Sequence, residues 1–376
     1  MRPIQMVDLK TQYQKIKPEI DKAVIDVLES SAFINGKPVQ DFADALATYL
    51  DIKHVIPCAN GTDALQISMM ALGLQPGDEV ITPSFTYIAT TEVVALLNLK
   101  PVFVEVDKQT FCMDVDSLRS AITSKTKAIV PVHLYGQAAN MEAIMQVANE
   151  HNIPVIEDNA QAIGSDYTFS DGTIKKAGTI GKVGCTSFFP SKNLGAYGDG
   201  GAMFTNDDEL AQNLKMIANH GQQKRYYHEV VGCNSRLDTL QAAILLIKLK
   251  ELDNYIASRR LVADRYDAAF ANHPKITTPY RAPYSNHVFH QYTLLLEGVD
   301  RNAIVEHLAS KQIPAMIYYP VPGHKQKMFD SFNTASINLE TTDWLTERVV
   351  SLPIHTELDE EQQAFITSSV LEFINQ

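Results

Sequence analysis

Residues 186–201 have the sequence TSFFPSKNLGAYGDGG, and this stretch decides how the rest of the chain is interpreted. A short apolar strand is expected to end here, with Lys192 directly after it and a glycine-rich run from Gly195 to Gly201. Glycines let the backbone approach a flat ligand closely, and a lysine held beside such a ligand can form a Schiff base. Most lysines are solvated, so a functional role for Lys192 can be inferred only together with motifs elsewhere in the chain.

A second motif follows another apolar strand, expected at 153–157, and contains Asp158 and Gln161. Open α/β sheets bind ligands at the carboxyl ends of their strands. A buried aspartate there is costly unless a cation meets it, and a protonated pyridine nitrogen is such a cation. Gln161 could then reach a neighbouring phenolic oxygen. The plain alternative for Asp158 is a carboxylate that caps a loop or a helix.

A third motif, Asn60-Gly61-Thr62, lies between an apolar strand and the helix after it. Free N–H groups and the positive end of the helix dipole suit a phosphate there, and Thr62 is its expected ligand. The alternative is an ordinary helix cap, for which threonine is also favoured. The three motifs together supply the groups that pyridoxal 5′-phosphate (PLP) needs.

Apolar strands alternate with helical segments through most of the chain. Strands are expected at 55–59, 79–82, 102–106, 128–132, 153–157, 184–189 and 201–205, and helices from Pro18, at 39–50 and 62–72, from Thr90 and at 141–151. Short apolar strands without alternation are typical of a mostly parallel sheet with helices on both faces. The expected fold class is therefore α/β.

A long helix is expected from Arg236 to about Tyr255, as a stiff connector. After it, a strand at 291–296, a helix at 301–311, the segment 315–319 and a helix from Glu360 predict a smaller α/β unit. We therefore expect a large domain at 1–250 and a small C-terminal domain at 251–376.

Composition narrows the class of protein. The chain has 376 residues and a net charge of -12, with no clustered stripe of Lys and Arg, so nucleic acid is not an expected partner. The four cysteines lie far apart and are interpreted as small buried hydrophobes, with no metal site expected. No signal peptide or membrane-spanning pattern is recognisable. We expect a cytoplasmic enzyme without a membrane partner.

Motifs for other chemistries fail on their spacing. The glycines at 198–201 lead into a strand and lack the G-x-G-x-x-G spacing, and Gly181-Lys182 is no Walker A loop. His228-Glu229 has no second histidine four residues on, and no G-x-S-x-G is present.

In combination, the three motifs resemble the DegT/StrS family of sugar-nucleotide aminotransferases, which are PLP enzymes of fold type I, similar to aspartate aminotransferase. The likeness extends from about residue 5 to the end of the chain. Further matching stretches lie at 77–83, 85–90, 220–221, 234–238 and 319–320.

The resemblance implies a role for each matching position. Lys192 is expected to bind the cofactor covalently and to shuttle the proton, and Asp158 to keep the pyridine nitrogen protonated. The other implied cofactor contacts are Gly61, Thr62 and Ser187 at the phosphate, Tyr87 on the ring, Gln161 at the phenolic oxygen and Asn234 from a second subunit. Asn234 therefore implies a homodimer with shared active sites.

Three residues are expected to face the sugar. Arg236 is the candidate for a sugar carboxylate, because a guanidinium matches a carboxylate with two hydrogen bonds, although a surface arginine at a helix start is the alternative. Tyr319 and Tyr318 are expected to line the pocket. Several relatives have histidine where Tyr318 stands, and alanine is usual where Asn159 stands.

The resemblance implies transfer of an amino group from L-glutamate to the 3-keto position of a UDP-2-acetamido-hexuluronic acid, for the O-antigen of lipopolysaccharide. One alternative is a dTDP-3-keto-6-deoxyhexose aminotransferase. Another is a PLP-binding regulatory protein, for which this acidic chain has no spare DNA-binding segment. Lys192 argues against the family branch that has histidine there and dehydrates its substrate.

Overall fold

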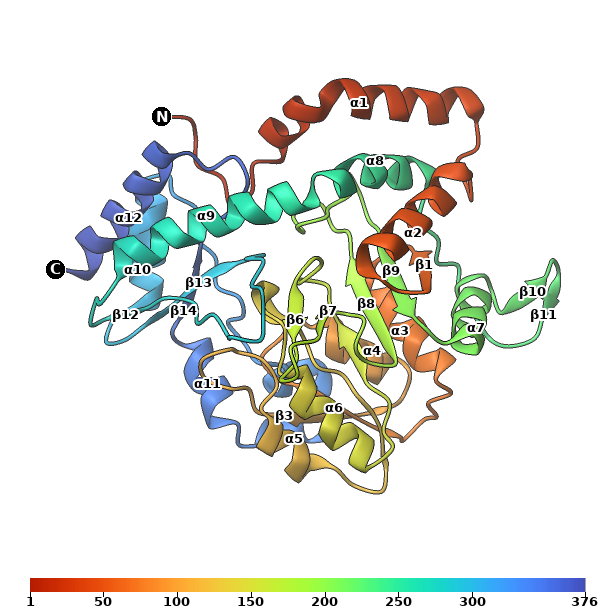
Figure 1. Ribbon diagram of the computed structural model, residues 1–376. Coiled ribbons are helices and arrows are strands. Elements are labelled where there is room, and N and C mark those ends of the chain that lie inside the picture. The colour runs from red at the N-terminus through yellow and green to blue at the C-terminus, as the bar shows by residue number, and fades with distance from the viewer. Residues whose placement is uncertain (376) are drawn as a thin grey trace.

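The computed structural model describes residues 1–375, and a central sheet organises most of them (Figure 1). Its strands lie in two groups, in the orders β3-β2-β4 and β5-β8-β9-β1. Parallel bridges from Ile129 to Val155 and from Val132 to Asp158 join the two groups. The strand bounds are β1 (His54–Cys58), β2 (Glu79–Pro83), β3 (Lys100–Val104), β4 (Thr126–Ile129), β5 (Ile156–Asp158), β8 (Val183–Ser187) and β9 (Gly201–Thr205).

All neighbouring strands in this sheet are parallel except around β9, which is antiparallel to both β8 and β1. The prediction of a mostly parallel sheet is therefore confirmed. Because β5 and β8 are parallel and Asp158 pairs with Cys185, Asp158 and Ser187 come to the same edge of the sheet.

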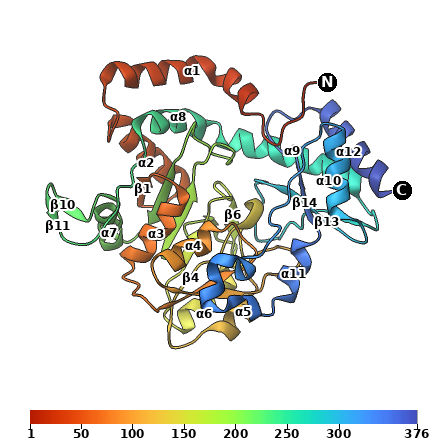
Figure 2. The same cartoon turned by 180° about the vertical axis from the view of Figure 1, so that it is seen from behind.

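Helices cover both faces of the sheet, as predicted (Figure 2). One face packs against α3 (Gly61–Ala71), α4 (Ala89–Leu96) and α7 (Asp208–Ala218), and the other against α5 (Val115–Ala121) and α6 (Met141–Glu150). Val80 and Ile81 are neighbours on β2, yet they belong to different core clusters because successive strand residues point to opposite faces.

A third apolar cluster lies beside β1 and β9, where α2 (Lys37–Leu50) packs against α8 (Thr239–Lys250). Phe42, Phe188 and Leu245 are fully buried in it. Phe188 lies four residues before Lys192, so this cluster anchors one limb of the lysine loop. The helix α1 (Leu9–Ser30) runs along the outside of α8 (Figure 1).

The C-terminal part is built on the antiparallel sheet β12-β13-β14. Its helices enclose a fourth cluster that includes Tyr266, Leu294 and Ile366, and Ile4 from the other end of the chain joins them. The bounds are α9 (Leu252–Phe270), β12 (Ile276–Thr277), β13 (Tyr292–Leu296), α10 (Arg301–Ser310), α11 (Glu340–Thr346), β14 (Val349–Leu352) and α12 (Glu360–Ile374).

Two hairpins stand outside these layers. The pair β6 (Asp166–Thr168) and β7 (Ile174–Lys176) packs over the sheet, whereas β10 (Gln222–Lys224) and β11 (Tyr227–His228) project beyond α7 (Figure 1). The side chains of Tyr226 and Tyr227 are mostly exposed at the tip of the projecting hairpin.

Several element boundaries differ from the sequence predictions. The first helix begins at Leu9, where Asp8 caps it, and Pro18 lies inside it. Pro18 is on an exposed face, where water can solvate the carbonyl that loses its hydrogen bond. The predicted connector helix is two helices, α8 and α9, with a break at Glu251. The segment 315–319 has only one bridge, from Met316 to Ser351.

Three of the four cysteines are buried as predicted, but Cys233 is only partly buried, and all four are free thiols. Among residues 1–375, no group of three or more His, Cys, Asp or Glu side chains could hold a metal ion. No helix within this described range is both long and apolar enough to cross a membrane.

Candidate active site

Lys192 lies in a tightly closed loop between β8 and β9. The Ala196 N–H donates to the Phe188 carbonyl (2.7 Å), and the Lys192 N–H donates to the Phe189 carbonyl (2.8 Å). A Cβ at Gly195 would stand 2.2 Å from the Pro190 carbonyl oxygen, so only glycine allows the two limbs to approach so closely. The glycine-rich run therefore closes the lysine loop, in addition to any role at a ligand.

Asp158 lies at the carboxyl end of β5 and its side chain is almost fully buried. Its carboxylate accepts hydrogen bonds from the Thr90 hydroxyl (2.8 Å) and from the Ala160 N–H (3.1 Å). No lysine, arginine or histidine in the described residues forms an ion pair with it. Asp158 is thus a buried carboxylate with fixed donors and no ion-paired side chain in the described residues, which suits a cationic pyridine nitrogen.

The residue before Asp158 anchors it. The buried Glu157 carboxylate accepts hydrogen bonds from the N–H groups of Gly178, Ile180 and Gly181, and it contacts His133 Nε2 at 2.9 Å. His133 in turn donates its backbone N–H to the Asp158 carbonyl (3.0 Å). These contacts fix the end of β5, and with it the direction of the Asp158 side chain.

The electrostatic surroundings make Lys192 a reactive amine. Burial lowers the pKa of Lys192 from 10.5 to about 8, and the nearby charge of Asp158 limits the fall. A lysine with this pKa has a substantial neutral fraction near pH 8, and only the neutral amine attacks a carbonyl carbon. The structure places Lys192 within electrostatic reach of Asp158.

The predicted phosphate-binding residues meet at the start of α3. A Cβ at Gly61 would stand 2.7 Å from the Ser187 Cβ, so the turn packs directly on the end of β8. The helix cap is Asn60, whose side chain accepts the Asp63 N–H (2.8 Å), rather than Thr62. Thr62 is therefore not used as a cap, and its hydroxyl lies in the first turn, where a phosphate would bind.

Gln161 is held in a defined orientation. Its carbonyl oxygen accepts the Tyr135 N–H (2.8 Å), and its amide nitrogen donates to the Tyr319 hydroxyl (3.0 Å). Tyr135 adopts a positive φ of 58°, which is uncommon for a residue with a side chain, and its hydroxyl donates to the Tyr318 carbonyl. Tyr135 thus links Gln161 to the segment that contains both predicted sugar-pocket tyrosines.

Aromatic side chains surround this network. The Tyr87 ring lies 6.1 Å from the Tyr319 ring, centroid to centroid, and is 56% exposed, so its face is available to a ligand. Burial raises the pKa of the Tyr319 phenol, which therefore stays protonated as a hydrogen-bond donor. The Tyr318 and Tyr319 rings are 5.9 Å apart, edge to face.

Asn234 and Arg236 differ from the other predicted site residues. Asn234 is exposed and Arg236 partly exposed, and within residues 1–375 neither side chain makes a hydrogen bond or an ion pair. Their segment follows the projecting hairpin and precedes α8. The structure therefore brings Lys192, Asp158, Gln161 and the tyrosines together. The side chains of Asn234 and Arg236 form no hydrogen bond or ion pair with them, although Ser235 between the two accepts the Ala59 N–H beside the start of α3 (3.0 Å).

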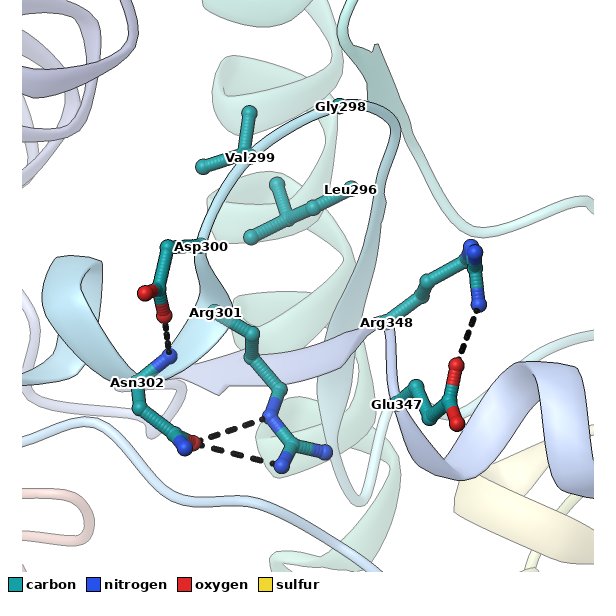
Figure 3. A pocket seen from close by; sticks show the side chains of 8 residues that line it. All are labelled: Leu296, Gly298, Val299, Asp300, Arg301, Asn302, Glu347 and Arg348. Carbon is teal, nitrogen blue, oxygen red and sulfur yellow. Dashed lines mark hydrogen bonds and ion pairs between the residues drawn. The ribbon is translucent and has the colours of Figure 1, made fainter.

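A separate hollow lies in the C-terminal part, between the start of α10 and the end of α11 (Figure 3). Two arginines line it, but both are already engaged. Arg301 donates to the Thr346 carbonyl and to Asn302, and Arg348 pairs with Glu347 at 3.1 Å. None of the predicted site residues lines this hollow.

Sequence reasoning missed two residues of the site. Thr90 lies in a stretch that matches the family, but only the structure shows its hydrogen bond to Asp158. The sequence gives no signal for Tyr135, since its contact to Gln161 is made by a backbone N–H that every residue except proline carries.

The residues present fit PLP. Gly61 packs the start of α3 against Ser187, where the first N–H groups of the helix have no partner within the helix. Asp158 is a buried acceptor without an ion pair, and Lys192 is a nearby amine of lowered pKa. The helix N–H groups match a phosphate, the Asp158 carboxylate matches a protonated pyridine nitrogen, and the Lys192 amine matches an aldehyde.

Comparison with known proteins gives concordant results. Residues 14–371 match the DegT/DnrJ/EryC1/StrS aminotransferase family. The chain is 47% identical over 356 residues to the UDP-2-acetamido-2-deoxy-3-oxo-D-glucuronate aminotransferase of Pseudomonas aeruginosa, covering 95% of this chain and 96% of that protein. It is 36% identical over 370 residues to the dTDP-3-amino-3,4,6-trideoxy-alpha-D-glucose transaminase of Streptomyces venezuelae, covering 98% and 96%.

A solved structure is similar along nearly the whole chain. NtdA from Bacillus subtilis, described with bound cofactor PMP, superimposes with a TM-score of 0.89 at 32% identity, covering 99% of this chain and 83% of that one. The predicted family, fold type and enzyme class are therefore confirmed. The chain belongs to the DegT/DnrJ/EryC1/StrS family of aminotransferases.

Proposed function

We propose that this aminotransferase moves an amino group from L-glutamate to the 3-keto position of a UDP-2-acetamido-hexuluronic acid. The observation that supports it best is the pairing of two features. Lys192, an amine of lowered pKa, lies near a buried Asp158 that forms no ion pair in the described chain, and Arg236 has no anionic partner there. The first feature supports amine transfer, and the second leaves a guanidinium for a substrate carboxylate.

The cofactor is PLP, as the sequence predicted. The family consists of aminotransferases, and the similar NtdA structure has PMP, the amino form of this cofactor. When bound, PLP supplies an electron-accepting ring that stabilises a carbanion at the substrate.

The chain's own residues have distinct proposed tasks. Lys192 Nζ would accept the proton from the substrate's alpha carbon and donate it to the cofactor carbon that bonds the transferred nitrogen, which its pKa of about 8 permits near neutral pH. Asp158 keeps the ring nitrogen positive, while Thr90 and Ala160 hold its carboxylate in place. Thr62 and Ser187 bind the phosphate, Gln161 orients the phenolic oxygen, and Tyr87 covers the ring face.

Arg236 is proposed to recognise the carboxylate of a uronate sugar. The Pseudomonas relative is named for a 3-oxo-glucuronate substrate, whereas the Streptomyces relative is named for a dTDP-linked deoxy sugar that has no carboxylate in its name. Tyr318 and Tyr319 line the sugar pocket in either case. The higher identity to the uronate enzyme, together with the unpaired Arg236, favours the UDP-uronate over the dTDP sugar.

The test compares the two sugar nucleotides on one enzyme preparation with glutamate as donor. The wild-type protein should have a much higher kcat/KM for the 3-keto UDP-uronate than for the dTDP-3-keto-6-deoxyhexose. Arg236→Ala should lower kcat/KM for the uronate by roughly 10²-fold, because a charge-assisted pair is lost, and should change the neutral sugar far less. Arg236→Lys keeps the positive charge but cannot form the two parallel hydrogen bonds of a guanidinium. Its kcat/KM for the uronate should therefore lie between those of the wild type and Arg236→Ala. Equal losses on both sugars would remove the carboxylate role.

Further parts of the proposal concern assembly and setting. We propose a homodimer in which Asn234 reaches the cofactor phosphate of the other subunit, which accounts for the absence of hydrogen bonds from its side chain within the described residues. The exposed Tyr226, Tyr227 and Val231 nearby supply apolar surface for such an interface. The measurement is molecular mass in solution, and a monomer with full activity would exclude shared sites.

We also propose a large domain at 1–250 and a small one at 251–376, a cytoplasmic location, and a place in O-antigen synthesis for lipopolysaccharide. Deleting the gene should remove one amino sugar from the cell-surface polysaccharide. An unchanged sugar composition would separate the enzyme from that pathway.

A further inference from the structure

The loop that contains Lys192 is held from behind by the helix α8. The Gln241 carbonyl oxygen accepts the Tyr197 N–H (2.8 Å), and its amide donates to the Tyr197 carbonyl (3.4 Å). Two helical turns further on, Lys248 Nζ donates to the Gly195 carbonyl. Gln241 and Lys248 are seven residues apart, so they lie on the same face of α8 and contact the same loop.

Lys248 is an unusual residue for its position. Its side chain is only 1% exposed, and it forms no ion pair with a carboxylate in residues 1–375. Its other close neighbour is the Tyr197 ring, whose centroid is 5.0 Å from Nζ. Burial, together with the positive charge of Arg259, lowers the pKa of Lys248 to about 7.

A buried amine without an ion pair costs free energy, so an apolar side chain of similar volume would fill this space more favourably. What an apolar side chain could not supply is a hydrogen bond to the Gly195 carbonyl. Gly195 is three residues after Lys192, and it packs against Pro190 on the opposite limb of the loop. A shift of Gly195 therefore displaces both limbs and the backbone of Lys192 between them.

We propose that Lys248 is a positioning residue for Lys192, because its Nζ fixes the Gly195 carbonyl and thereby the closed loop from Phe188 to Ala196. The proposal rests on the covalent role of Lys192 in the proposed function, but it holds for any sugar substrate. The amine of Lys248 bonds to the Gly195 carbonyl and lies over the Tyr197 ring, and it forms no hydrogen bond with Gly61, Ser187 or the sugar-pocket tyrosines in residues 1–375.

The test is Lys248→Met, with Lys250→Met as the matched control, since Lys250 is exposed on the same helix. The measured quantity is the rate at which apoprotein binds PLP covalently, followed by visible absorbance, together with the pH midpoint of that absorbance. Loss of one hydrogen bond that aligns the amine should slow attachment roughly tenfold and move the midpoint. Lys250→Met should match the wild type.

A purely structural role makes a different prediction. It would lower the thermal unfolding midpoint of Lys248→Met and leave the attachment rate and the pH midpoint unchanged, and this result would overturn the proposal. Lys248→Arg keeps a donor and should recover most of the rate. If the Met variant does not fold, Lys248→Gln replaces it in the test. The glutamine side chain is one bond shorter than lysine, so its amide does not reach the Gly195 carbonyl. A wild-type rate of PLP attachment in this variant would also refute the positioning role of Lys248.

The two proposals fail in distinguishable ways. Full activity in Lys192→Ala would remove the proposed function, whatever Lys248 does. An inactive Lys192→Ala beside a Lys248→Met variant with wild-type attachment would remove only the positioning role.

Discussion

The cofactor-binding region and the segment with Asn234 and Arg236 are supported in opposite ways. Asp158 and Gln161 are each held by two hydrogen bonds from the same chain, and the Lys192 loop is closed by its own backbone. Asn234 and Arg236 have no such contacts among residues 1–375. One chain thus fixes the side chains of Asp158 and Gln161, whereas within the described residues no hydrogen bond fixes the side chains of Asn234 and Arg236.

The largest expected effect is at Lys192, in the cofactor-binding region. Lys192→Ala should reduce transamination by roughly 10²–10⁴-fold, because both the proton shuttle and the covalent link to PLP are lost. Borohydride should then trap no PLP on the protein. Lys182→Ala, which removes only an exposed partner of Asp207, should be nearly silent. Wild-type turnover in Lys192→Ala would show that the region is not catalytic.

Mixing variants tests whether Arg236 serves the partner's site. Lys192→Ala and Arg236→Ala should each be nearly inactive on the uronate. If Arg236 acts across the interface, half of the randomly mixed dimers contain one intact site, and about a quarter of the wild-type activity should return. Mass analysis must first show that mixed dimers have formed. If they have formed and no activity returns, Arg236 serves the active site of its own chain, and its proposed action across the interface is contradicted.

A smaller effect is expected from the support beneath Asp158. Thr90→Val keeps the shape and removes the hydroxyl that donates to the carboxylate at 2.8 Å. A hydrogen bond to a charged group contributes about 1.5–3 kcal/mol, so kcat should fall at least tenfold. Thr91→Val is the matched control, since its hydroxyl donates only to the Ile88 carbonyl within α4. Equal losses in both variants would indicate general damage to that helix.

The smallest effect is a pH dependence of PLP attachment. The neutral amine of Lys192 is the nucleophile, and its fraction rises with pH until pH exceeds the pKa. With a pKa lowered to about 8, the rate should rise up to about pH 8 and level off above it. Rapid-mixing absorbance across pH measures this curve. A rate still rising steeply at pH 10 would mean that Lys192 titrates like a solvated lysine.

Much of this organisation was predictable from local sequence. The sheet strands and most helices were predicted because apolar runs and glycine or proline breaks are local signals. Lys192 and Asp158 were identified because each follows a buried strand, and parallel pairing of β5 and β8 then brings both to one edge.

What could not be predicted depends on contacts between distant segments. The sequence predicts a helix start at Pro18, whereas the helix begins at Leu9, because whether a proline is tolerated inside a helix depends on which face is solvated. The contacts of Tyr135 with Gln161 and of Lys248 with Gly195 use backbone groups, which have no sequence signature. Neither residue could be assigned before the fold was known.

The cluster that contains Ile4 also contains Ile374. In the same region, the Arg2 guanidinium forms an ion pair with the Asp359 carboxylate at 3.1 Å. Ile4 is synthesised before Ile374, so this hydrophobic core cannot close completely until α12 has been translated. Until then, Ile4 lacks the α12 side chains that help to bury it in the folded protein.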